Sequence, residues 1–209
     1  MDRSAIVLAG RFSSRFEQDI SVLELKGEPL LQHVVDAVNV IVDEVLVIAD
    51  SQERSDEYLE ILGSHVKFIV ANSAEQGSLA GALAGFEAAT QKYALLLSSG
   101  APFVSQEIME LLFDLCPGKS AVIPRWPNGE IEALHAVYRV DAVLQAARQA
   151  FSEGCSDLVD VVEKLRGVRY VSTLVVQELD PDLKTLFKVN SPVELKRAEV
   201  LANPRRTKK

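Results

Sequence analysis

The residues with the clearest chemical potential follow a short apolar run near the start of the chain. Leu8, Ala9 and Gly10 lead into a loop that carries Ser13 and Arg15. The backbone N–H groups of such a loop and the fork of an arginine guanidinium both suit phosphate oxygens. The segment therefore predicts a phosphate or nucleotide site, although an ordinary turn after a strand also ends in glycine.

Later segments offer further candidates, each with a plainer structural alternative. Residues 77–81 open a helix with small side chains, which suits either an anion at the helix N-terminus or close packing on a sheet. Asn190 either points an amide oxygen into a crevice or caps the helix that begins at Pro192. His135 alternates with apolar neighbours, which is typical of a strand residue with a satisfied ring rather than of a general base.

The elements that must position these loops alternate along the chain. Apolar, β-branched runs predict strands at residues 5–9, 44–49, 66–70, 93–98, 120–123, 134–139 and 168–172. Apolar spacing of three and four predicts helices at residues 29–38, 56–62, 79–90, 105–115, 140–151, 156–165 and 192–201. This order predicts βαβ units and a mostly parallel sheet covered on both faces, with the first strand near its centre. Ligands of such sheets bind beyond the carboxyl ends of the strands.

Composition limits the classes of function. The 209 residues, 48% hydrophobic and 25% charged, predict one globular domain over residues 1–202 and a flexible basic tail over residues 203–209. A net charge of -8 disfavours nonspecific binding to nucleic acid or acidic lipid. The absence of a long apolar run and of a signal-like start predicts a cytoplasmic protein without a membrane span. The two cysteines, Cys116 and Cys155, are too few and too far apart in sequence to indicate a zinc site or a disulfide framework. They are interpreted as buried or bystander thiols.

Taken together, these segments resemble molybdenum cofactor guanylyltransferases of the MobA type, within the nucleoside triphosphate transferases. The family opens with Leu-Ala-Gly-Gly-x-Ser-x-Arg-x-Gly, then an acidic residue with Lys, then Gly-x-Pro-Leu. This chain matches with Leu8-Ala9-Gly10, Ser13, Arg15, Asp19 and Gly27-Glu28-Pro29-Leu30. Residues 77–81 are similar to the family's Gly-Pro-Leu-Ala-Gly, and residues 189–192 to its Asn-Thr-Pro segment. The resemblance extends from Ala5 to about Leu201.

The resemblance implies a three-layer, Rossmann-like α/β nucleotidyltransferase fold and transfer of GMP from GTP to molybdopterin with Mg²⁺. The nucleotide-binding residues that it implies are Leu8, Ala9, Gly10, Ser13, Arg15 and Gly81. Arg15 and Asp19 are the catalytic candidates, and Asn190 is the candidate for the metal. The expected partners are GTP or another nucleotide, molybdopterin, and either a catalytic paralogue or a second copy of the chain.

Several residues that differ from the family pattern stand at positions to which the family's chemistry is assigned. Arg11 and Glu17 replace glycines of the first loop, and Ile20 replaces the phosphate-pairing lysine. Gly100 replaces the aspartate that holds Mg²⁺. The alternative is therefore a catalytically degenerate relative with a binding, regulatory or partner role.

The same departures suggest ways in which the chemistry is kept or regained. Asp19, Asp50 or Glu132 would have to supply the missing metal carboxylate. Gly100→Asp is expected to restore metal binding, and activity is expected to need Ile20→Lys as well.

Overall fold

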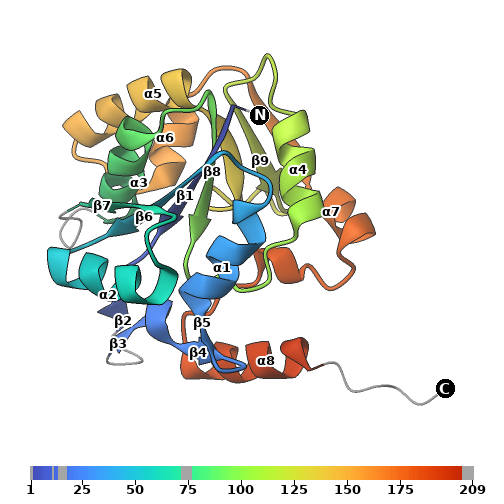
Figure 1. The fold of residues 1–209 in the computed structure, drawn as a ribbon. Coiled ribbons are helices and arrows are strands. Elements are labelled where there is room, and N and C mark those ends of the chain that lie inside the picture. Colours follow the sequence, from blue (N-terminus) through green and yellow to red (C-terminus); the bar gives the residue numbers. More distant parts are fainter. Residues whose placement is uncertain (1, 11, 14–17, 72–76, 204–209) are drawn as a thin grey trace.

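The computed structural model describes residues 2–10, 12–13, 18–71 and 77–203 (Figure 1). The strands are β1 (Arg3–Leu8), β2 (Phe12–Ser13), β3 (Gln18–Asp19), β4 (Glu24–Leu25), β5 (Glu28–Pro29), β6 (Glu44–Ala49), β7 (Lys67–Val70), β8 (Tyr93–Ser98), β9 (Ala121–Arg125), β10 (Ala136–Arg139) and β11 (Val168–Ser172). The α-helices are α1 (Leu30–Asn39), α2 (Gln52–Leu62), α3 (Gly77–Ala88), α4 (Gln106–Asp114), α5 (Val140–Ser152), α6 (Leu158–Lys164), α7 (Thr173–Leu179) and α8 (Pro192–Ala202). Short 3₁₀ turns cover Ile20–Val22 and Lys184–Leu186.

The central sheet has seven strands in the order β11-β9-β10-β8-β1-β6-β7. The first strand lies inside it, because β1 pairs in parallel with both β6 and β8, with Leu8 opposite Ile48 and Ser98. The exception to the parallel arrangement is β10, which runs antiparallel to β8 and β9. The predicted mostly parallel sheet is thus confirmed, and the carboxyl ends of β1, β6 and β8 meet at one edge.

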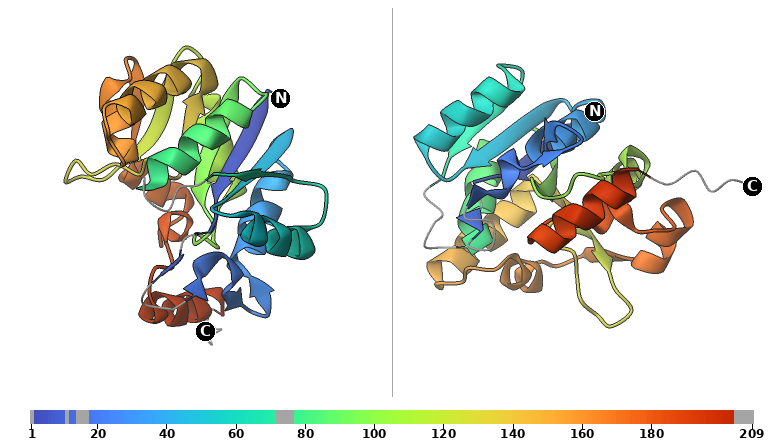
Figure 2. Two further views of the ribbon diagram at one scale, coloured as in Figure 1. Left: turned by 90° about the vertical axis from the view of Figure 1, so that its left-hand side faces the viewer. Right: turned by 90° about the horizontal axis from the view of Figure 1, so that it is seen from below.

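Helices cover both faces of the sheet, which makes three layers (Figures 1 and 2). One apolar core joins the sheet to α1, α2, α4 and α7, and the other joins it to α3, α5 and α6. The predicted apolar face of α1 is fully buried: Leu31, Val34, Val35 and Val38 are all 0% exposed. Burial of each such aliphatic side chain contributes roughly 1.5–3 kcal/mol, so this face fixes α1 against β1 and β6.

A third, smaller core lies beside the carboxyl edge, where α8 packs near β4 and β5 (Figure 1). Its buried members are Ile20, Leu23, Leu25, Leu30, Val189 and Ala198. The segment before α8 therefore meets the segment after β3, although about 170 residues separate them in the sequence.

Local capping explains where the observed helices differ from the predicted ones. The helix predicted at residues 56–62 begins at Gln52, because the Ser51 hydroxyl accepts a hydrogen bond from the Arg54 N–H at 3.3 Å. The helix predicted at residues 156–165 begins at Leu158 after the Asp157 cap. α7 was not predicted.

Two glycines let α3 lie close to the sheet. A Cβ atom on Gly85 would lie 2.4 Å from Ile6 Cγ2, whereas one on Gly81 would meet Leu8 Cδ2 at 3.5 Å. Within the described ranges, no helix has the length and apolar character that a bilayer crossing needs. The part of the predicted basic tail that follows Asn203 lies outside the described residues.

Candidate nucleotide site at the carboxyl edge of the sheet

The predicted nucleotide segment begins where β1 leaves the sheet. The Ala9 N–H donates to the Ile48 carbonyl at 2.9 Å, and the Ser99 N–H donates to the Leu8 carbonyl at 3.0 Å. These bonds hold the chain after β1 between β6 and β8. Leu8, Ala9 and Gly10 therefore lie at the edge where ligands of this architecture bind.

Gly10 is needed at its position for two reasons. Its φ is +78°, a left-handed conformation that other residues adopt at a cost. A Cβ atom there would also lie 2.8 Å from Asp50 Cγ and 2.9 Å from the Asp50 backbone nitrogen. This contact places Asp50, one of the proposed replacement carboxylates, directly beside the first loop.

The remaining residues of the first loop are only partly described. Ser13 belongs to β2, which pairs with β3 opposite Gln18. Arg15, together with Arg11 and Glu17, lies outside the described residues. The roles predicted for Ser13 and Arg15 stay predictions.

Asp19 is enclosed within the protein. It is 1% exposed, and one carboxylate oxygen accepts the Ser21 N–H at 2.9 Å while the other accepts the Tyr58 hydroxyl. The guanidinium of Arg54 lies 4.0 Å from the second oxygen. Burial, and then the Asp19 charge, raise the pKa of Tyr58, so its hydroxyl remains a donor. Asp19 thus caps the turn at Ile20 with both oxygens engaged.

A pair of serines that the sequence did not single out joins three loops of the edge. The hydroxyls of Ser21 and Ser99 lie 2.9 Å apart, and the Gly10 N–H donates to the Ser21 hydroxyl at 3.3 Å. Both serines are nearly inaccessible to solvent. This neutral network occupies the junction of β1, β3 and β8, and no spacing signal in the sequence links residues so far apart.

Protein atoms surround Gly100, which the resemblance predicts to match the family's metal ligand. A Cβ atom on Gly100 would lie 2.9 Å from the Val189 carbonyl oxygen and 3.3 Å from Ile20 Cγ2. Ile20, which was predicted to match the family's lysine, is 3% exposed within the third core. Magnesium needs hard oxygen ligands, usually with one or two carboxylates. The oxygens nearest to that Cβ position belong to the Val189 carbonyl and, at 3.7 Å, to the Ser98 hydroxyl, and neither is a carboxylate.

The proposed replacement carboxylates do not gather into a metal site. Glu132 accepts the Trp126 indole N–H at 2.8 Å with one oxygen and the Lys188 ammonium with the other. Across the described ranges, no group of three or more His, Cys, Asp or Glu side chains is placed to hold a metal ion. The described residues therefore do not fit Mg²⁺ at this edge.

The helix cap predicted as an alternative for Asn190 belongs to Ser191. The Ser191 hydroxyl accepts the Glu194 N–H at 3.3 Å, and the Glu194 carboxylate accepts the Asn190 N–H at 2.7 Å. This pattern resembles a capping box, except that Glu194 accepts the N–H of the residue before the N-cap. It uses the backbone of Asn190, so its side chain is not the cap, and the role predicted for it at a metal stays a prediction.

The interpretation of His135 as a strand residue with a satisfied ring is wrong. Its φ is +83°, and β10 starts one residue later. Nδ1 lies 2.7 Å from the Leu134 carbonyl, but Nε2 has no hydrogen-bond partner within the described part of the protein. Burial, and then the charge of Lys188, lower the pKa of His135 to about 3, so the ring is neutral near pH 7.

Gly81 lies in α3, where its Cβ direction faces β1 and β6. A Cβ atom on Gly81 would lie 3.5 Å from Leu8 Cδ2 and 3.7 Å from Ile48 Cγ2, which are ordinary van der Waals separations. The position therefore brings α3 close to the end of β1, as the packing alternative predicted. Its nucleotide-binding role stays a prediction.

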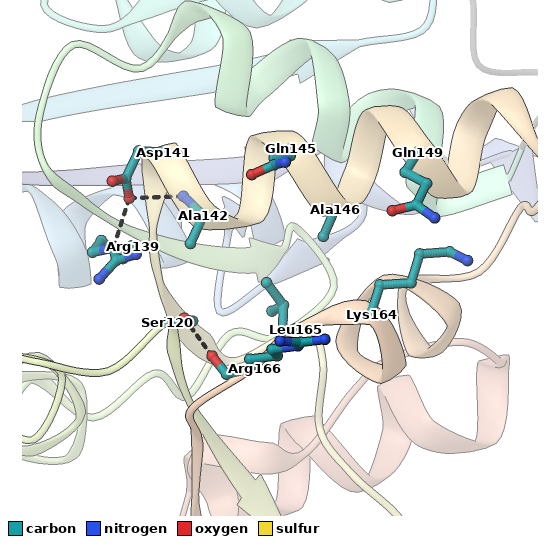
Figure 3. Close-up of a pocket in the computed structure, with 10 residues that line it drawn as sticks. All are labelled: Ser120, Arg139, Asp141, Ala142, Gln145, Ala146, Gln149, Lys164, Leu165 and Arg166. Atoms are coloured by element: carbon teal, nitrogen blue, oxygen red, sulfur yellow. Dashed lines mark hydrogen bonds and ion pairs between the residues drawn. The ribbon is translucent and has the colours of Figure 1, made fainter.

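A cavity of about 510 Å³ lies at the opposite edge of the sheet (Figure 3). Its lining comes from the end of β10, the start of α5 and the segment before β11: Ser120, Arg139, Asp141, Ala142, Gln145, Ala146, Gln149, Lys164, Leu165 and Arg166. Arg139 is paired with Asp141 at 2.6 Å. Because ligands of parallel sheets bind at the carboxyl edge, we place the candidate site there and not in this cavity.

Known proteins are similar to this chain in sequence and in fold. The profile of the MobA-like NTP transferase domain matches residues 5–172. A protein of Methanosarcina mazei named "Probable molybdenum cofactor guanylyltransferase" is 29% identical over 198 residues, which cover 92% of this chain and 88% of that protein. A molybdenum cofactor guanylyltransferase of Desulfosudis oleivorans is 28% identical and covers 94% of each chain.

The likeness extends to solved structures. Molybdopterin-guanine dinucleotide biosynthesis protein A of Archaeoglobus fulgidus superposes with a TM-score of 0.81 at 22% identity, over 96% of this chain and 98% of that one. A 2-C-methyl-D-erythritol 4-phosphate cytidylyltransferase of Thermus thermophilus gives a TM-score of 0.69 at 20% identity, over 96% and 98%. The fold is thus that of nucleotidyltransferases. The profile match over most of its length shows that the chain belongs to the MobA-like NTP transferase family.

Proposed function

We propose that this protein transfers GMP from GTP to molybdopterin. The observation that carries the proposal is the family match over residues 5–172, with relatives named as guanylyltransferases along nearly the whole chain. In this reaction a phosphate oxygen of molybdopterin attacks the α-phosphorus of GTP. A new P–O bond forms, the bond between the α-phosphorus and the bridging oxygen breaks, and pyrophosphate leaves.

The nucleotide would bind at the half of the edge formed by β1 and β6. Leu8, Ala9 and Gly10 lie there, with the Ala9 and Gly10 N–H groups donated to Ile48 and Ser21, and the left-handed Gly10 brings the loop against Asp50. Arg15 would pair with the nucleotide phosphates. Gly81 would let the start of α3 approach the same ligand.

A divalent metal is general in this family, where it balances the charge of the triphosphate. The Gly100 position lacks a carboxylate, and the Val189 carbonyl fills its space. We therefore derive no step through Mg²⁺ at this edge. The charge that remains to balance the phosphates must come from cationic side chains of the chain itself.

The lack of a charged side chain at Ile20 and at Gly100 favours a second function. With Ile20 and Gly100 at the two positions where the family carries charge, the chain would bind GTP or molybdopterin without transferring GMP. It would then serve as a binding or regulatory partner of a catalytic paralogue, or assemble with its own copies. In either case we infer a cytoplasmic protein that does not bind nucleic acid.

Two measurements on the purified protein separate these functions. Calorimetric titration with GTP, in the presence of Mg²⁺ and separately of EDTA, measures binding. Transfer of a label from the α-phosphate of GTP to molybdopterin measures the reaction. Labelled molybdopterin guanine dinucleotide supports transfer. Binding of equal affinity with and without metal, together with no labelled product, supports the second function. Absence of GTP binding contradicts transfer, and absence of both GTP and molybdopterin binding contradicts both functions.

A further inference from the structure

The cavity beside α5, at the edge of the sheet opposite the candidate nucleotide site, is lined by three cationic side chains (Figure 3). Arg139 ends β10, Lys164 ends α6, and Arg166 lies in the segment that leads into β11. Among the described residues that line the cavity, Asp141 is the one acid. This local excess of positive charge contrasts with the net charge of -8 that the whole chain carries.

Ser120 holds the backbones of the two arginines at the cavity. Its carbonyl accepts the Arg139 N–H at 2.9 Å, and its hydroxyl donates to the Arg166 carbonyl at 2.6 Å. Both bonds use backbone atoms of the arginines. Either guanidinium can therefore be replaced without removing a hydrogen bond that positions the chain here.

The positive charges of the cavity are only partly balanced. The Arg139 Nε–H donates to Asp141 at 2.6 Å, and Lys164 contacts Glu153. The Arg166 guanidinium has no hydrogen-bond or ion-pair partner in the part of the chain that the structure describes. An arginine has five N–H donors, so Arg166 offers its whole fork to a ligand and Arg139 keeps donors beyond its Nε–H.

The rest of the lining combines apolar and amide groups. Ala142, Ala146 and Leu165 supply apolar surface, and the amides of Gln145 and Gln149 line the cavity on the α5 side (Figure 3). The cavity volume of about 510 Å³ lies within the range of small-molecule pockets, roughly 300–1,000 Å³. The space thus suits an anionic group attached to a small uncharged body.

We propose that this cavity binds a phosphate group through the guanidinium groups of Arg139 and Arg166, with a small phosphate monoester as the ligand that fits its volume. Arginine forks match phosphate oxygens with paired N–H···O bonds. A phosphate dianion also needs more positive charge than one arginine supplies, and Lys164 adds to it from the same lining. The site is separate from the carboxyl edge, so the inference does not depend on the proposed function.

Calorimetric titration in EDTA with inorganic phosphate and with glycerol 3-phosphate tests the proposal. Arg166→Met should weaken the binding of both probes by roughly tenfold, the effect of losing a charged hydrogen bond. The matched control is Arg148→Met, because Arg148 also belongs to this region but pairs with Glu87 of α3 at 2.9 Å and does not line the cavity. It should leave both affinities unchanged. Thermal unfolding checks that each variant is folded.

Asp141→Asn should give a change of opposite sign. It removes the negative charge that competes for Arg139 and should tighten phosphate binding by roughly two- to fivefold. The asparagine oxygen can still accept the Ala142 N–H, which Asp141 accepts at 2.7 Å, so the start of α5 is preserved. Equal or weaker phosphate binding in this variant would show that Arg139 does not contact the ligand.

The two probes also identify the source of the phosphate group. Tighter binding of glycerol 3-phosphate assigns the cavity to an ester, whereas equal or tighter binding of inorganic phosphate assigns it to the free ion. Succinate, a dicarboxylate, tests the anion itself. Succinate binding that matches phosphate and depends on Arg166 would overturn the assignment to phosphate.

Three further results would overturn the inference. They are equal phosphate affinity in Arg166→Met and Arg148→Met, wild-type protein that binds neither phosphate probe, and phosphate binding that Arg15→Ala abolishes but Arg166→Met leaves intact. The last result would place the phosphate at the nucleotide loop. Phosphate binding through Arg166 in a protein that transfers no GMP would contradict the proposed reaction and leave this inference standing.

Discussion

The carbonyl oxygen of Val189 lies 2.9 Å from the position that a Cβ atom on Gly100 would occupy. The Val189 N–H donates to the Gly100 carbonyl at 2.8 Å, and this hydrogen bond holds the two backbones together. A side chain at residue 100 must therefore displace the backbone that leads into α8. This contact revises the expectation that an aspartate there simply restores a metal site.

Gly100→Asp is expected to lower the free energy of unfolding by about 1–3 kcal/mol, the usual cost of overpacking. It should not create Mg²⁺ affinity, because the carboxylate has no space beside the Val189 carbonyl. Denaturant unfolding and Mg²⁺ titration of the variant measure the two effects. Gly100→Ala, which adds only the Cβ atom, should show most of the same destabilisation. A stable aspartate variant that binds Mg²⁺ would contradict this account.

Ile20→Lys is expected to destabilise the protein by roughly 2–4 kcal/mol, because it places an ammonium in an apolar core. Ile20 is 3% exposed, so the new charge has no route to water without opening the third core. Val193→Lys, at a residue that is 69% exposed on α8, is the control and should change stability little. Chemical denaturation measures both. Unchanged stability of Ile20→Lys with tighter GTP binding would show that a phosphate-facing position is open there.

Two glycines of α3 should respond differently to alanine. Gly85→Ala should cost about 1–3 kcal/mol, because its Cβ would lie 2.4 Å from Ile6 Cγ2. Gly81→Ala has room at 3.5 Å and should gain up to about 1 kcal/mol from helix propensity. Thermal unfolding compares the two variants. If Gly81→Ala also leaves GTP affinity unchanged, the nucleotide role predicted for this residue is wrong.

Glu44 should give the protein part of its acid sensitivity. Burial opposes its charge, but hydrogen bonds from Lys67, Thr90 and Ser4 prevail and lower its pKa from 4.5 to about 2. A depressed pKa stabilises the fold above the unfolded value, and this stabilisation is lost as the pH falls from about 4.5 to about 2. Its size is on the order of 3 kcal/mol for a side chain that is 4% exposed.

Glu44→Gln tests this linkage. The variant should be less stable than the wild type near neutral pH, and the two free energies of unfolding should converge toward pH 2. Unfolding curves measured at a series of pH values provide the comparison. A constant difference across the acid range would show that the Glu44 charge does not contribute in this way.

Arg15→Ala is expected to weaken GTP binding by roughly tenfold, and by more than Arg11→Ala, because Arg15 matches the family's loop and Arg11 departs from it. Calorimetric titration of both variants gives the two affinities. The prediction comes from the sequence pattern alone. A GTP affinity that Arg15→Ala leaves untouched would show that the family's role does not carry over at this loop.

Much of the fold was predictable because buried strands and amphipathic helices leave strong local patterns. The runs at residues 44–49, 93–98 and 168–172 have the same bounds as β6, β8 and β11. α7 was missed because Leu174, Val175 and Val176 form a continuous apolar run without helical spacing, directly after a strand. The antiparallel direction of β10 was missed because direction depends on pairing with β8, which no local pattern encodes.

The candidate site was predictable where one segment carries the signal and not where distant segments meet. Gly10 was identified as a candidate from its place after a strand, and the structure shows a left-handed backbone there. The contact between Ser21 and Ser99 joins residues 78 positions apart, so spacing could not indicate it. The bare Nε2 of His135 likewise depends on what the fold places around the ring.

Because β10 runs against its neighbours, it starts at the carboxyl edge where β9 ends, and the chain passes from β9 to β10 without a crossover helix. The residues between β9 and β10 form a connection at this edge, with a paired strand at each end. Insertions or replacements in this connection are expected to leave the register of β1, β6 and β8 unchanged. We therefore expect changes in this connection to alter the half of the edge beside β10 and to leave the half formed by β1 and β6 unchanged.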